Sequence, residues 1–348
     1  MVAVFLLVAM GMEAIYSVDL SRGTELIFFR KQFIAFGLGL TLAIFASMLH
    51  YSWFRSGAKL AYFGSLLLLI GVLIFGQTIR GTRGWFVIGG FSLQPVEFAK
   101  IGIILLLAAI VAHFGRRFER PLFFFGTGFI TLCLIALIMR QPDLGSAVLI
   151  GIIWFGLMYL VGARARHMVG LVVVGVLFSV AAWFFLLEGY QKDRLLNFIH
   201  PDRDPLNTGY NVMQSTIAVG AGKVFGRGLG FGSQSQLRFL PEAQTDFVFS
   251  VIGEELGFAG TAILVTLYGV MLWRLIVIMQ STNDDFVSAT LAGITVLFAS
   301  QFFINIGAEI GLLPVTGVTL PFVSYGGSSL IVNMLLIGIA QSMVVRKY

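Results

Sequence analysis

The sequence predicts an all-α polytopic membrane protein with about ten transmembrane helices and one large extracytoplasmic loop between helices 7 and 8. Three observations support this prediction. Of the 348 residues, 58% are hydrophobic and 11% are charged, and the mean hydropathy is +0.93. A soluble domain carries about 25% charged residues. We therefore expect residues 1–348 to form a single membrane domain, with the loop at about residues 188–245.

The predicted helices are apolar runs of about 17–25 residues, the length that crosses a bilayer. In chain order they are 1–18, 33–49, 60–77, 95–113, 121–139, 143–161, 167–187, 246–272, 288–308 and 326–345. Pro95, Pro121 and Pro142 lie at predicted helix starts, where proline is tolerated because the first N–H groups have no intrahelical partner. The other prolines lie in connecting segments.

Lysine and arginine residues in the short loops indicate the orientation, because cytoplasmic loops carry an excess of them. Ten, including Arg55 and Arg117, lie on one side, and six, including Arg22 and Arg80, lie on the other. We place the first set and both termini in the cytoplasm, with the long loop outside. The net charge of +6 is assigned to contact with anionic lipid headgroups. Nucleic acid is not expected as a partner.

The single cysteine, Cys133, excludes a disulfide framework and a multi-cysteine metal site. The glycine-rich segment 220–230 resembles a phosphate cradle in composition, but no Gly-Lys-Ser/Thr closes it. It is either a flexible turn with two solvated cations or a site for an anionic headgroup. The preceding residues, 210–220, predict a short amphipathic helix. The stretch 313–329 looks re-entrant. Irregular backbone at membrane depth is tolerated only where it packs against protein or lines a wet cavity.

Asp246 opens the eighth predicted helix directly after the long polar loop. An ionisable group at or inside a membrane helix usually marks a site, although an aspartate at a helix start can also be an N-cap. On a helix, Ser250 shares a side with Asp246. Glu254 lies about 80° away, at the edge of that side, and Glu255 lies opposite. We predict a functional role for Asp246 and expect Glu255 to pair with a neighbouring helix.

Glu97 and Lys100 lie three residues apart near the start of the fourth helix, close enough to form an ion pair. Such a pair is compatible with a structural role. It is equally compatible with a polar site, because a neighbouring cation keeps a carboxylate ionised. Asp143, which follows Pro142, is expected to cap the sixth helix.

An ordered series of motifs resembles the SEDS family (shape, elongation, division and sporulation) of bacterial membrane glycosyltransferases, over essentially the whole chain. The motifs are Gly84-Trp85, Gln94–Lys100, Gln141–Gly145, Gly209–Ser215, Pro241–Phe247, Gly253–Gly257 and Leu320–Ser329. Residues 232–237 resemble the elongation branch, RodA, which the whole chain resembles most. The triplet 253–255 resembles the division branch, FtsW, which is the second choice of branch. Gln244 departs from the family pattern, which often has His there, and this puts a base partner at that position in doubt.

The resemblance implies a peptidoglycan polymerase that joins lipid II units, with inversion and loss of undecaprenyl diphosphate, for cell elongation and rod shape. It also implies a class B penicillin-binding protein as partner. The location implied is the bacterial inner (plasma) membrane, with the active site facing outside the cytoplasm. No cofactor is firmly implied, and a divalent cation such as Mg²⁺ is compatible with the chemistry.

In this interpretation Asp246 is the general base that takes the proton of the acceptor hydroxyl. The residues expected to bind substrate are Glu97, Lys100, Arg80, Arg83, Lys223, Arg227, Arg238, Glu242 and Ser324. A second interpretation is a lipid II flippase or transporter, whose path Glu97, Asn305 and Glu309 would help to line. A third is a non-catalytic scaffold for the penicillin-binding protein. A transporter predicts acids spread through the membrane, whereas Asp246 lies at the outer boundary.

Overall fold

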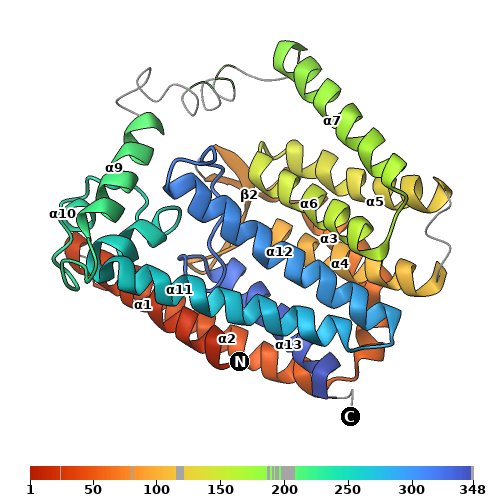
Figure 1. Ribbon diagram of the computed structural model, residues 1–348, viewed down its shortest axis with the longest axis horizontal. Helices are drawn as coiled ribbons and strands as arrows, with labels where there is room; N and C mark the ends of the chain where they lie inside the picture. Colours follow the sequence, from red (N-terminus) through yellow and green to blue (C-terminus); the bar gives the residue numbers. More distant parts are fainter. Residues whose placement is uncertain are drawn as a thin grey trace. The chain divides into compact units, whose positions relative to one another are not determined.

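The computed structural model describes residues 1–23, 25–79, 81–114, 121–185 and 208–345, together with residues 189, 192 and 196. These residues form mostly helices, together with one small sheet of three short strands (Figure 1). The helices are α1 (Val2–Arg22), α2 (Ile27–Met48), α3 (Tyr51–Phe75), α4 (Pro95–Phe114), α5 (Pro121–Met139), α6 (Leu144–Val161), α7 (Ala165–Phe185), α9 (Thr208–Ala221), α10 (Ser233–Gln236), α11 (Val248–Gln280), α12 (Asp285–Glu309) and α13 (Gly327–Val345). The strands are β1 (Gln77–Ile79), β2 (Thr82–Ile88) and β3 (Phe91–Leu93).

The helical membrane architecture is confirmed, since every predicted apolar run coincides with one long helix. Among the described residues, eight helices are long and apolar enough to cross a membrane, and the described part of α5, Phe123–Met139, is shorter. The number of crossings therefore stays a prediction. Pro95 and Pro121 are the first residues of α4 and α5, as expected. The predicted amphipathic segment forms α9, which extends from Thr208 to Ala221.

The sheet was not anticipated by the all-α prediction. Its three antiparallel strands have the order β1-β2-β3, with Phe86 opposite Leu93 and Ile88 opposite Phe91. Gly89 and Gly90, both with positive φ, make the two-residue connection between β2 and β3. Paired positive φ values suit the turn that connects two twisted strands, and glycine adopts them without steric cost. The Gly-Gly pair after Val87-Ile88 was therefore a usable hairpin signal.

The chain divides into two compact units. The first comprises Met1–Phe29, Arg164–Tyr268 and Gln301–Tyr325. The second comprises Arg30–Ala163, Gly269–Ser300 and Gly326–Tyr348. Small residues allow close helix packing in the second unit, as they do in membrane helix pairs generally. A Cβ atom added to Gly338 of α13 would lie 2.4 Å from the Ala43 carbonyl oxygen of α2.

Helix α11, in the part that belongs to the first unit, is broken at Gly257, whose φ of 67° and ψ of −163° are not helical. The break leaves backbone donors and acceptors without helical partners, and these are costly inside a membrane unless another group satisfies them. The loop before α10 supplies those groups. Phe258 N donates to Lys223 O (2.8 Å), and Arg227 N donates to Glu254 O (3.0 Å). Residues 223–228 therefore complete the backbone hydrogen bonding of the broken helix.

Close packing at this break explains why position 226, in the segment 220–230, is a glycine. A Cβ atom on Gly226 would lie 2.0 Å from the Glu255 carbonyl oxygen, and its φ is 81°. Neither alternative raised by the sequence, a flexible turn or a phosphate cradle, anticipated this role. The N–H groups of Arg227 and Gly228 are already bonded to α11 carbonyls.

Candidate functional site

Asp246 lies in the turn 241–247 of the first unit and is partly exposed, whereas Thr245 beside it is buried. The helix itself begins two residues later, at Val248. Asp246 N donates to Glu242 O (3.1 Å). On the other side, Asn305 Nδ2 of α12 donates to Asp246 O (3.3 Å). The main chain of Asp246 is thus held both by its own turn and by a side chain from a distant helix, which fixes the position of its backbone.

Arg22 at the end of α1 contacts the same turn. Its Nη2 donates to Gln244 Oε1 (2.8 Å), and its guanidinium lies 5.2 Å from the centre of the Phe28 ring. Gln244 Nε2 in turn donates to Glu242 Oε2 (3.3 Å). The sequence analysis counted Arg22 only as a loop charge. No local pattern indicates its contact with Gln244, because the two residues are 222 positions apart.

Ser324 lies in the irregular segment between α12 and α13 and is buried. Its Oγ accepts a hydrogen bond from Leu320 N (2.9 Å), and the Tyr268 hydroxyl donates to Pro321 O. Phe322 in the same segment has a φ of 67°. Such backbone strain persists only where the surroundings enforce it, and it concentrates at functional sites. The expectation of irregular, protein-buried backbone is confirmed, and its re-entrance into a membrane stays a prediction.

The two acids at positions 254 and 255 hold α10 in the first unit. Glu254, predicted at the edge of the Asp246 side, accepts hydrogen bonds from Gln234 N (2.8 Å) and Ser235 N (3.0 Å). Glu255 pairs with a neighbouring helix, as predicted, because Ser17 Oγ of α1 donates to its Oε1 (2.5 Å). Both acids are buried, and both bind groups of α10.

Four of the five predicted outer cations are described, and Arg80 lies outside the described residues. Three exposed arginines donate to carbonyl groups at the C-terminal ends of α3, α9 and α1, where cations are favourable. The pairs are Arg83 Nη2 to Ile74 O (2.9 Å), Arg227 Nε to Ala221 O (3.3 Å) and Arg238 Nη2 to Arg22 O (3.1 Å). Lys223 is also exposed, and within the described part of the chain its ammonium group has no recorded hydrogen bond.

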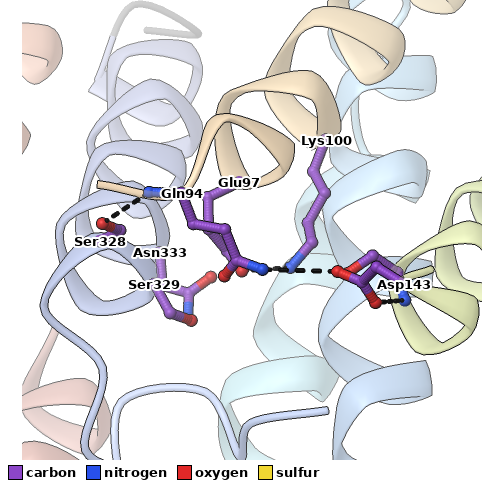
Figure 2. Close-up of polar contacts among 8 residues, drawn as sticks. Gln94, Glu97, Lys100, Asp143, Ser328, Ser329 and Asn333 are labelled. Atoms are coloured by element: carbon purple, nitrogen blue, oxygen red, sulfur yellow. Dashed lines mark hydrogen bonds and ion pairs between the residues drawn. The ribbon is translucent and has the colours of Figure 1, made fainter. Parts of the chain in front are cut away.

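Glu97 and Lys100 form the predicted ion pair in the second unit (Figure 2). Lys100 Nζ lies 2.8 Å from Glu97 Oε1, and the two side chains are 2% and 6% exposed, respectively. The second carboxylate oxygen, Glu97 Oε2, is buried without a hydrogen-bond partner among the described residues. Buried polar atoms are nearly always satisfied, so this oxygen is a candidate acceptor for a ligand or water.

Polar groups from three further segments surround this pair in Figure 2. Gln94 Nε2 donates to Asp143 Oδ2 (3.4 Å), and Ser328 Oγ of α13 accepts from Gln94 N (3.1 Å). Asn333 Nδ2 donates to Ser329 Oγ (3.3 Å), while Asn333 Oδ1 is buried with no partner among the described residues. Two unsatisfied acceptors, Glu97 Oε2 and Asn333 Oδ1, therefore belong to one polar cluster.

Asp143 caps α6, as expected, by accepting a hydrogen bond from Ser146 N (3.0 Å). Its second oxygen also accepts from Ser146 Oγ (2.7 Å). The residues that the structure describes contain no group of three or more His, Cys, Asp or Glu side chains that could hold a metal ion. Side chains alone therefore do not form a metal-binding site among the described residues.

A family described as cell cycle protein, comprising FtsW, RodA and SpoVE, matches residues 1–348. Stage V sporulation protein E of Bacillus subtilis is 36% identical over 346 residues, covering 96% of this chain and 93% of the relative. The peptidoglycan glycosyltransferase MrdB of Escherichia coli is 38% identical over 309 residues, covering 88% of this chain and 82% of the relative.

Two solved structures resemble the chain over nearly its whole length. One is described as showing structural coordination of polymerization and crosslinking by a peptidoglycan synthase complex. It has a TM-score of 0.85 and 33% identity, and covers 99% of this chain and 97% of the other. The other is the rod shape determining protein RodA of Thermus thermophilus, with a TM-score of 0.74 and 31% identity, covering 99% and 95%.

Proposed function

This chain belongs to the FtsW, RodA and SpoVE family of cell cycle proteins, and from that premise we propose that it is a multi-pass membrane glycosyltransferase that polymerises lipid II into peptidoglycan strands. Relatives that share more than a third of its residues are named peptidoglycan glycosyltransferases. The likeness to RodA and to MrdB favours a role in cell elongation and rod shape.

The proposed reaction forms one glycosidic bond and releases one diphosphate. The oxygen of the acceptor sugar hydroxyl attacks the anomeric carbon of the donor from the face opposite its diphosphate. The bond from that carbon to the diphosphate breaks, and its electron pair leaves with undecaprenyl diphosphate. The hydroxyl proton passes to the Asp246 carboxylate. Proton transfer to a positioned base is typically worth 10²–10⁴-fold in rate.

The observation that carries this proposal is the turn around Asp246. Asp246 is partly exposed, while its backbone is held by Glu242 and by Asn305. A base must be fixed within hydrogen-bond reach of the proton that it removes, and a constrained backbone with an accessible side chain meets that need. Arg22, bonded to Gln244 in the same turn, brings a cation that suits an anionic substrate.

We further propose that the polar cluster of the second unit is a binding site of its own for saccharide or peptide groups of lipid II. Its two unsatisfied atoms, Glu97 Oε2 and Asn333 Oδ1, are acceptors. They therefore suit hydroxyl and amide donors better than they suit phosphate oxygens. Lys223, exposed in the first unit, and Arg22 suit the diphosphate. A divalent cation such as Mg²⁺ would enter with the diphosphate, as Mg²⁺ commonly does in phosphate-transfer sites.

The proposed setting is the bacterial inner (plasma) membrane, with Asp246 facing outside the cytoplasm. The proposed partner is a class B penicillin-binding protein. A structural relative belongs to a peptidoglycan synthase complex that coordinates polymerization with crosslinking, and a transpeptidase of that class would supply the crosslinking.

Purified protein in detergent tests the enzyme assignment directly. We expect it to convert labelled lipid II into glycan polymers that a gel resolves by length. A transporter would give no glycan polymer, because a detergent solution offers no second compartment to which it could move lipid II. Complete absence of polymer, with the purified partner present and Mg²⁺ supplied, would contradict the glycosyltransferase assignment. Movement of lipid II across vesicles under the same conditions would then support the transporter.

A further inference from the structure

Three buried residues from different helices of the first unit meet near Asp246. They are Ser215 of α9, Ser250 of α11 and Glu309 of α12, and each is 0% exposed. Ser250 Oγ lies 2.7 Å from Glu309 Oε2 and 2.6 Å from Ser215 Oγ. Ser215 Oγ lies 2.6 Å from the backbone oxygen of Glu309. These contacts close a ring through the side chain and main chain of Glu309.

The number of hydrogen atoms in this ring constrains its protonation. Each of its three oxygen–oxygen contacts requires one hydrogen, because two oxygens at 2.6–2.7 Å without one between them repel. The two serine hydroxyls supply one hydrogen each. The backbone oxygen of Glu309 supplies none. A carboxylate at Glu309 would leave one contact without a hydrogen, whereas a carboxylic acid supplies the third.

We propose that Glu309 is held as a neutral carboxylic acid whose ring with Ser250 and Ser215 positions Asp246. In this ring Glu309 donates to Ser250 Oγ, Ser250 donates to Ser215 Oγ, and Ser215 donates to Glu309 O. Glu309 is a positioning residue, because it acts on the reaction through the turn that carries the base. The positioning part of the inference rests on the proposed function of Asp246, whereas the protonation part does not.

The link to Asp246 runs through the start of α11. Glu309 Oε2 accepts from Ser250 N (2.7 Å), and Oε1 accepts from Phe249 N (3.4 Å). These N–H groups belong to the first turn of the helix, which has no intrahelical acceptors for them. Asn305, one turn earlier on α12, bonds Asp246 O. Two side chains of one helix face therefore clamp residues 246–250.

Neutrality also matters for the charge of the base. Asp246 lies close enough to Glu309 to interact with it electrostatically. The groups that α9 and α11 present to Glu309 are serine hydroxyls and backbone N–H groups. An ionised Glu309 would place a second negative charge beside Asp246 and would disfavour its anion. A neutral acid holds the turn without that repulsion.

Infrared spectroscopy of the purified protein tests the protonation state. The wild type should show a carboxylic-acid C=O stretch at neutral pH that shifts in ²H₂O, and Glu309→Gln should lack it. Ser250→Ala should shift the band, because it removes the acceptor of the acid proton. A wild-type spectrum without any band that Glu309→Gln removes would overturn the proposal. This measurement requires no activity and no ligand.

Polymerisation by the same variants tests the positioning role. Glu309→Gln keeps the shape of the side chain and one oxygen that can accept from Ser250 N, so it should retain more of the wild-type kcat than Glu309→Ala, which should lose roughly tenfold or more with KM little changed.

The exposed neighbour Thr216, whose hydroxyl bonds only its own helix, provides the matched control, Thr216→Ala. Equal losses of kcat in Glu309→Gln and Glu309→Ala would overturn the positioning role. An active Asp246→Asn would instead overturn the proposed function, and the infrared result would stand independently of it.

Discussion

At the scale of single residues, Asp246 depends on groups that lie far away in the chain. Asn305 holds its backbone, and Arg22 holds the neighbouring Gln244. Gln244 stands where a histidine was expected from the family resemblance, and it serves as a link between Arg22 and Glu242. An amide cannot act as a base, so Gln244 does not supply a base to this turn.

Replacement of Asp246 by Asn tests that role. Asn keeps the size of the side chain and caps helices as well as Asp, but it cannot take the hydroxyl proton. We expect polymerisation to fall by roughly 10²-fold or more, with thermal stability and partner binding retained, when equal amounts of protein are compared on a gel. Asp285→Asn, at an exposed position, is the control and should match wild type. Near-normal glycan from Asp246→Asn would exclude general-base catalysis by this residue.

The Glu97–Lys100 pair makes a second prediction at this scale. Both partners are buried, so Lys100→Ala leaves an uncompensated carboxylate, at a cost of about 3–5 kcal/mol. Adding Glu97→Gln should recover part of the lost thermal stability, because it removes that charge. The measurement is a double-mutant cycle of unfolding temperatures in detergent. Strict additivity would show that the two side chains do not interact.

The outer cations give a third prediction, because the structure separates their roles. Arg238 donates to carbonyls at the end of α1, whereas no hydrogen bond of the Lys223 ammonium is recorded among the described residues. Arg238→Ala should lower the unfolding temperature. Lys223→Ala should raise the KM for lipid II and leave that temperature unchanged. If Lys223→Ala leaves KM at its wild-type value, Lys223 does not bind the diphosphate.

At the scale of elements, the break in α11 is the feature that shapes the site. Gly257 interrupts the helix, and residues 223–228 restore the lost hydrogen bonds. The same loop continues into α10, which Glu254 caps and Glu255 links to α1. The helix that carries Ser250 and the loop 223–236 are therefore one hydrogen-bonded structure.

Gly226→Ala should disturb this structure. The added methyl group would lie 2.0 Å from the Glu255 carbonyl oxygen, so backbone must move, at a cost of about 1–3 kcal/mol. We expect a lower unfolding temperature and reduced polymerisation. Gly220→Ala is the matched control, because its added Cβ meets nothing within 4 Å. Equal unfolding temperatures for the two variants would show that the loop does not pack on the break in solution.

At the scale of the whole molecule, the short-loop charges predict cytoplasmic termini and an outward long loop. Single cysteines in a Cys133→Ser background test this orientation in intact cells. Phe231→Cys, in the long loop, is 77% exposed before substitution and should react with an impermeant reagent. Ser56→Cys, in the exposed part of α3 near Arg55, should not. Labelling of Ser56→Cys from outside would reverse the orientation.

Gly232 would be a poor choice for such labelling, although it lies in the same loop. A Cβ atom there would lie 2.4 Å from Ser235 Oγ and 2.6 Å from Glu254 Oε2. A cysteine at this position would disturb the cap of α10, and a failure to react would then say nothing about orientation.

The long helices and the Glu97–Lys100 pair could both be predicted from the sequence. Each depends on local information: a bilayer demands apolar runs of a set length, and residues three apart share a helix face. The two-residue hairpin of β2 and β3 carried a comparable local signal in Gly89-Gly90, which the apolar content of the surrounding segment concealed.

The hydrogen-bond network around the site was decided by the tertiary structure alone. Ser17 and Glu255 are 238 positions apart, and Ser215 meets Glu309 across 94 positions. Periodicity places a side chain on a face of its own helix, but which helix covers that face depends on how all of them pack. A buried polar atom requires a partner wherever the chain can bring one. The sequence therefore determined which residues could do chemistry, and packing determined which of them meet.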